Sequence, residues 1–147
     1  MTRSADRATP DPDWRVYEKA VAAHISRLDP GLNVEHDQRL PGLLSGRLRQ
    51  IDVLVRTVIA GETILIVYEC KHFRRPVGLA TVEEFIAKLE DVGANQGVLF
   101  VSGGLTEAAV RRLENTTLPR VNAYAYALPG ADRLSGRYEE LDWEAMA

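Results

Sequence analysis

The spacing of apolar residues along the chain predicts three helices and five strands. Apolar positions recur every three or four residues over 13–28 and 79–92, and a shorter helix is expected over 107–115, after the capping residue Thr106. Between them lie runs that are rich in Val, Ile and Leu and are bounded by Gly, Pro and Asp, as in strands. Strands are therefore expected at 32–36, 50–59, 62–70, 97–101 and 121–128.

The order of these elements, α-β-β-β-α-β-α-β, predicts an α/β fold. A hairpin that turns at Ala60-Gly61 is followed by strands joined through helices, which gives a mixed central sheet flanked by helices. We expect a disordered arm at 1–12, one domain over 13–130 and an acidic tail over 131–147.

The composition of the chain bears on its cellular compartment and on membrane association. No apolar run approaches the roughly 20 residues of a membrane helix, and the first residues do not resemble a signal peptide. The single cysteine, Cys70, excludes an internal disulfide, which agrees with a reducing compartment. The expectation is a cytoplasmic protein without a membrane association.

Two of the predicted strands carry charge in positions where apolar residues are usual. Asp52 interrupts a run of Ile, Val and Leu, and Glu69 and Lys71 follow the apolar run that ends at Val67. Since side chains alternate along a strand, Glu69 and Lys71 point to the same face. Burial of a polar group without a hydrogen-bond partner costs about 2–7 kcal/mol, and burial of an unpaired carboxylate costs more. These acids therefore need a partner, and a metal ion or another cation is the usual one.

Pairing of the two strands as a hairpin makes Asp52 and Glu69 cross-strand neighbours. Two close carboxylates repel each other unless a cation lies between them, and oxygen ligands at an open site suit Mg²⁺ or Mn²⁺. With Lys71 beside them, these are the groups that metal-assisted phosphodiester hydrolysis requires. The alternative is a cross-strand salt bridge between Asp52 and Lys71 with Glu69 as a solvated strand end, and the carboxylates alone do not decide between the two.

Charge is unevenly distributed along the chain. The net charge is −3, which argues mildly against nonspecific binding of nucleic acid. Residues 39–75 nevertheless carry seven cations against three anions, while 138–147 is acidic. His24, His36 and Cys70 lack metal-ligand spacing.

The charged strands and their surroundings resemble the PD-(D/E)xK nuclease superfamily, and most closely its Mrr-type restriction endonuclease branch. The resemblance covers about 17–128 and begins with Glu18, which lies beside the apolar stripe of the first helix. Its further motifs are RQIDVL at 49–54, YECK at 68–71, the helix that contains Phe85, DVGANQGVLFVS at 91–102 and LTEAA at 105–109. Ile51 stands before the aspartate where many members have proline.

This resemblance implies a restriction-endonuclease-like core and a site of four side chains. Asp52 and Glu69 would be metal ligands, together with the Cys70 backbone carbonyl, and Lys71 would be the catalytic lysine. Glu18 would correspond to the first-helix acid that binds metal directly or through water, although a role in capping or at the surface is an equal alternative. Contacts to DNA phosphates are expected from Arg49, His72, Arg74 and Arg75.

The resulting hypothesis is a DNA endonuclease that depends on Mg²⁺, with Mn²⁺ able to substitute. A chain of this length leaves no room for a separate recognition domain, so it would act as a homodimer or beside a partner protein. One alternative is a structure-specific nuclease of the Holliday-junction resolvase kind. Another is a noncatalytic subunit with a nuclease fold that binds DNA or protein.

Overall fold

A long antiparallel hairpin and two parallel strands form the central sheet of the protein. The computed structural model describes residues 13–126, and its sheet has the strand order β1-β2-β3-β4-β5. β1, β2 and β3 pair antiparallel, whereas β3, β4 and β5 pair parallel through helical crossovers. The elements are α1 (Asp13–Leu28), β1 (Asn33–Pro41), β2 (Leu48–Ile59), β3 (Glu62–Lys71), α2 (Leu79–Val92), β4 (Gln96–Val101), α3 (Glu107–Glu114) and β5 (Arg120–Ala125).

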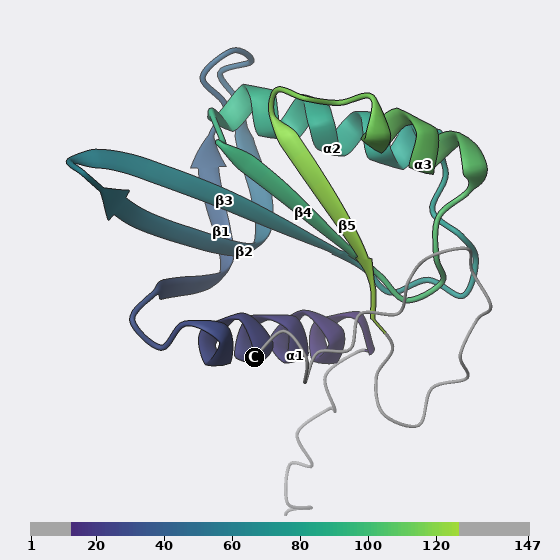
Figure 1. Ribbon diagram of the computed structural model, residues 1–147, viewed down its shortest axis with the longest axis horizontal. Helices are drawn as coiled ribbons and strands as arrows, with labels where there is room; N and C mark the ends of the chain where they lie inside the picture. Colours follow the sequence, from purple (N-terminus) through teal and green to yellow (C-terminus); the bar gives the residue numbers. More distant parts are fainter. Residues whose placement is uncertain (1–12, 127–147) are drawn as a thin grey trace, which may run out of the picture.

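Helices cover both faces of this sheet (Figure 1). α1 lies alone on one face and contributes Tyr17, Val21 and Ile25 to one apolar cluster. α2 and α3 lie on the other face, where Phe85 and Leu89 are at the centre of a larger cluster. The predicted α/β fold with a mixed sheet between helices is therefore confirmed. None of the helices in residues 13–126 is long and apolar enough to cross a membrane.

The first strand is longer than the sequence pattern indicated. We expected a strand over 32–36 and a turn from Leu40, but β1 continues to Pro41, which pairs with Leu48 of β2. Pairing with β2, a long-range contact, keeps the polar stretch after His36 extended. The last strand ends at Ala125 rather than 128, and the predicted arm, the acidic tail and residues 127–130 of the predicted domain lie outside the described part of the chain.

The alternation of side chains breaks where β1 passes Asp52. The ladder pairs His36 with Val53 and Gln38 with Ile51, and it skips the intervening pair, Asp37 and Asp52. Asp37 has a positive φ of 53°. Beyond this point the faces change, because Val53 packs on the α1 side of the sheet but Ile51 packs on the α2 side. Asp52 thus lies at a local irregularity of the strand, a feature that is frequent beside active sites.

Candidate active site

The β2–β3 ladder ends with the pair of Val53 and Tyr68, and Asp52 and Glu69 are the next residues on the two strands. The charge of Glu69 acts on Asp52 and contributes to the raised pKa of that carboxyl. The backbone N–H of Cys70 donates to Asp52 Oδ2 at 2.9 Å. This bond fixes the orientation of the Asp52 carboxylate relative to the strand that carries Glu69 and Lys71.

Glu18 joins the two strands from the first helix. Its side chain is buried, and its carboxyl group lies beside that of Asp52. His36 Nε2 lies 3.3 Å from Glu18 Oε2. Burial and then the charge of Asp52 raise the pKa of Glu18 to about 7, and burial raises the pKa of Asp52 as well. Two adjacent carboxyls with raised pKa values share a proton unless another cation takes its place.

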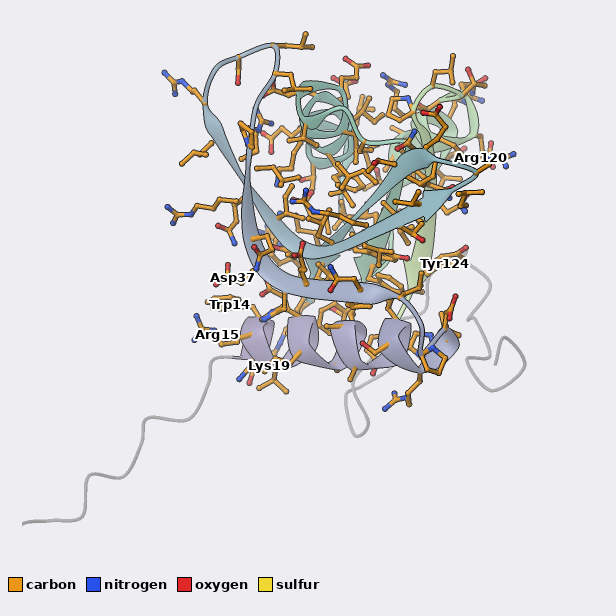
Figure 2. All side chains as sticks on the ribbon, turned by 90° about the vertical axis from the view of Figure 1, so that its left-hand side faces the viewer. Trp14, Arg15, Lys19, Asp37, Arg120 and Tyr124 are labelled. Atoms are coloured by element: carbon orange, nitrogen blue, oxygen red, sulfur yellow. The ribbon has the colours of Figure 1, made fainter. Side chains whose placement is uncertain are left out.

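Asp37 brings a further negative charge to this side of the site. It lies at the irregular point of β1, and its charge also raises the pKa of Glu18. Figure 2 shows Asp37 above the N-terminal turns of α1, close to Trp14 and Arg15. Arg15 acts in the opposite direction and lowers the pKa of Glu18.

Glu69 has a partner that the sequence analysis missed. Lys88 of α2 places Nζ 2.6 Å from Glu69 Oε1, and the two side chains are only 18% and 9% exposed. The alternative salt bridge between Asp52 and Lys71 is not formed among residues 13–126. The sequence contains only a weak indication of this ion pair. Lys88 is the only cation of α2, and it stands between the buried residues Phe85 and Leu89 along the helix.

Lys71 lies on the same strand face as Glu69, and its Nζ lies 5.8 Å from the centre of the Phe73 ring. Cys70 points to the opposite, α1 side of the sheet. Burial, followed by the charge of Asp52, raises the pKa of its thiol far above the ordinary value. The thiol is therefore neutral and unsuited to act as a nucleophile, and only its backbone remains relevant to the site.

The loop after Lys71 presents two arginines on a fixed backbone. Arg74 and Arg75 are exposed. The Ser102 hydroxyl donates to the carbonyl of Phe73 at 3.0 Å, and the amide of Val77 donates to the carbonyl of Gly104 at 2.7 Å. A Cβ at Gly103 would lie 2.3 Å from the Phe73 oxygen and 2.5 Å from the Arg75 oxygen, so only glycine permits this close approach. The loop is thereby held next to the end of β3.

Two other predicted DNA contacts have partners inside the protein. The His72 ring stacks on Tyr17 at a centroid distance of 4.9 Å, and its Nδ1 is buried without a hydrogen-bond partner. Arg49 Nη1 lies 3.2 Å from Asp91 Oδ2. The roles of both residues in DNA binding remain predictions, and what the structure describes for them is a packing contact and an ion pair.

The donor set suits a small divalent cation. Within residues 13–126, no three His, Cys, Asp or Glu side chains are arranged around one point. Mg²⁺, however, is commonly held by one or two carboxylates and keeps several waters. Glu18 and Asp52 supply such a pair, and burial is the main cause of the raised pKa values of both carboxyls. Lys88 is bound to one oxygen of Glu69, Oε1, so a metal at Glu69 would replace this ammonium or share the carboxylate with it.

These features define a restriction-endonuclease-like nuclease domain. Its α/β/α core carries an acid on the first helix, an acid on one strand and an acid-x-lysine sequence on the next strand. Comparison with known families agrees: residues 13–123 match the family model Mrr_cat, described as "Restriction endonuclease". The chain therefore belongs to the Mrr-type restriction endonuclease family, and the resemblance inferred from the motifs is confirmed. No curated protein sequence matches the chain.

Comparison with solved structures gives one neighbour that shares the fold and a second, weaker similarity. A crystal structure titled "Protein of Unknown Function AF1548" superposes with a TM-score of 0.60 at 20% identity, over 80% of this chain and 61% of that one. The "DNA modification-dependent restriction endonuclease AspBHI" gives a TM-score of 0.41 at 15% identity, over 84% of this chain and 35% of that protein. The present chain thus spans less than two thirds of either structure.

Proposed function

We propose that this protein is a metal-dependent DNA endonuclease that hydrolyses phosphodiester bonds with Mg²⁺ or Mn²⁺. The observation that carries the proposal is the gathering of three acids at one place: buried Glu18, Asp52 bonded to the Cys70 N–H, and buried Glu69 on the strand of Lys71. Burial of several acids in one place is costly for stability. A cost of that kind is typical of a functional site.

Each side chain of the site has a chemical role in this proposal. Asp52 would hold the cation with a carboxylate that the Cys70 N–H orients, and Glu18 would add a second oxygen ligand. A divalent cation supplies a bound water of lowered pKa and neutralises charge on the phosphate. Lys71 would stabilise the negative charge that develops on the phosphate oxygens. Arg74 and Arg75, exposed on the anchored loop, would hold the DNA backbone on either side of the cleaved bond.

One observation favours a second function, a noncatalytic DNA- or protein-binding subunit. Glu69 is occupied by Lys88, and no three acids in the described part of the chain converge on one point. The nuclease is preferred because Glu18, Asp52, Glu69 and Lys71 are all present and because the family is one of nucleases. Cutting of both strands would need a second copy or a partner protein.

Cleavage of DNA by the purified protein tests the proposal. Supercoiled plasmid, methylated plasmid and four-way junctions are incubated with the protein and Mg²⁺ or Mn²⁺, with EDTA as the blank. The expected result is nicked or linear plasmid with the wild-type protein and none with Asp52→Asn or Lys71→Met. Glu62→Gln, which alters an exposed acid at the far hairpin turn, is the matched control and should cut normally.

Different outcomes separate the functions. Cleavage that persists in Asp52→Asn would contradict the assigned site, because that carboxylate is central to it. Cleavage confined to four-way junctions would identify a structure-specific nuclease. Binding of DNA without cleavage under every condition would favour the noncatalytic subunit.

A further inference from the structure

Lys88 is the one lysine of α2 and reaches the site from the face of the sheet opposite α1. Its Nζ lies 2.6 Å from Glu69 Oε1, the length of a charge-assisted hydrogen bond. Glu69 is buried, with 7% of the whole residue exposed. The ammonium also acts beyond its direct partner, since its charge offsets part of the rise that burial causes in the pKa of Asp52.

The three acids of the site have different partners in the structure. Glu18 Oε2 lies 3.3 Å from His36 Nε2, and Asp52 Oδ2 accepts a hydrogen bond from the Cys70 N–H. Glu69 is bound directly by the ammonium of Lys88.

A metal ion would have to replace or share these partners. The carboxylate of Glu69 loses much of its attraction for a divalent cation while an ammonium is bound to one of its oxygens. The ammonium and the metal would also repel each other at close range. Lys88 and a metal ion therefore compete for the same carboxylate.

We propose that Lys88 is a positioning residue that acts as the built-in counter-cation of Glu69 and competes with the catalytic metal for it. It stabilises the metal-free protein and lowers the affinity of the site for the ion. The competition with the metal rests on the proposed function, since it requires a metal at these acids. The stabilising role of Lys88 does not, since it concerns the metal-free protein alone.

Removal of the charge should tighten metal binding. Lys88→Met is expected to bind Mn²⁺ about tenfold more tightly than the wild-type protein or better, because the variant removes a positive charge that would repel the ion at close range. Lys88→Arg, which keeps the charge, should bind much as the wild type does. Arg111→Met is the matched control, because it removes one cation from an exposed position of α3. Calorimetry or the electron paramagnetic resonance of free Mn²⁺ gives the affinity without any measurement of cleavage.

The same variant should be less stable when no metal is present. Loss of one partner from a buried ion pair leaves the other charge uncompensated, so Lys88→Met should melt several degrees below the wild type in EDTA. The double variant Lys88→Met with Glu69→Gln should recover much of that loss, because no isolated carboxylate remains.

The outcomes separate the competition proposed for Lys88 from the metal site itself. If the wild type binds Mn²⁺ and Lys88→Met binds it equally or more weakly, the competition proposed for Lys88 is wrong and the metal site stands. If neither protein binds Mn²⁺, both the metal site and the competition are wrong. Melting of Lys88→Met at the wild-type temperature in EDTA would overturn the stabilising role of the ion pair.

Discussion

The carboxyl group of Glu18 in α1 lies beside that of Asp52 in β2, and burial followed by the charge of Asp52 raises the pKa of Glu18 to about 7. The site therefore favours a protonated Glu18 at a pH where an isolated glutamate would be ionised. This relationship makes the stability of the metal-free protein sensitive to pH.

Stability in EDTA is expected to fall as the pH rises from about 4.5 to about 7. The pKa of Glu18 is raised from 4.5 to about 7, so in this window the folded state binds more protons than the unfolded state. The stabilisation is complete below the unfolded value and is lost as the pH passes the folded value. Melting curves across this range measure it. Glu18→Gln should flatten the dependence, whereas an unchanged slope would show that Glu18 is not its source.

Divalent metal should reverse this loss at alkaline pH. A cation that binds the folded protein and not the unfolded chain raises the melting temperature by mass action. We expect Mg²⁺ or Mn²⁺ at pH 8 to stabilise the wild type and Glu62→Gln but not Asp52→Asn, as measured by differential scanning fluorimetry. An equal rise in Asp52→Asn would place the ion elsewhere.

Lys71 should contribute to the reaction and not to the binding of metal. It shares a strand face with Glu69 but has no ion-pair partner among residues 13–126. Lys71→Met is therefore expected to lower cleavage by about 100-fold or more and to leave the metal-induced shift in melting temperature intact. Loss of that shift together with activity would instead indicate a role in building the site.

Arg74 and Arg75 should contribute to the electrostatic part of DNA binding. Both are exposed on the loop that packs against Gly103. Each phosphate contact contributes about 0.9 to the slope of log affinity against log salt concentration. Replacement of both by alanine should lower that slope by about 2, as measured by fluorescence anisotropy in EDTA with a labelled duplex. Arg111→Ala on α3 is the control, and an unchanged slope in the double variant would exclude the loop from the interface.

Asp91 should be important for stability although it lies away from the proposed chemistry. One oxygen accepts from the amides of Leu44 and Ser45, and the other accepts from the Ser45 hydroxyl and lies 3.2 Å from Arg49. These bonds hold the β1–β2 turn and lower the pKa of Asp91. Asp91→Ala should lower the urea midpoint at neutral pH, whereas Glu90→Ala, at an exposed neighbour, should not. Its contribution should also decline as the pH falls through the folded pKa.

Much of the fold follows from local patterns. The helix over 79–92 was predicted with the observed bounds because four apolar residues share one face and Gly93 ends it in the left-handed conformation. The hairpin around Ala60-Gly61 was also predicted, because two strand-like runs flank these two residues, and both turn residues have positive φ in the structure. The extension of β1 to Pro41 was missed because pairing with β2, rather than apolar alternation, holds those residues in a strand.

The candidate site divides in the same way. Strand alternation and the hairpin turn set the register of β2 and β3, so residue order was enough to place Asp52, Glu69 and Lys71 on adjacent strands. Residue order was also enough to recognise the family, because the motifs occur in the family's order. Three contacts are visible only in the folded protein: the Glu18 carboxyl lies beside that of Asp52, Lys88 pairs with Glu69, and Arg49 pairs with Asp91. Each of these contacts joins elements far apart in the chain, and their geometry depends on how the helices pack on the sheet, which residue spacing does not specify.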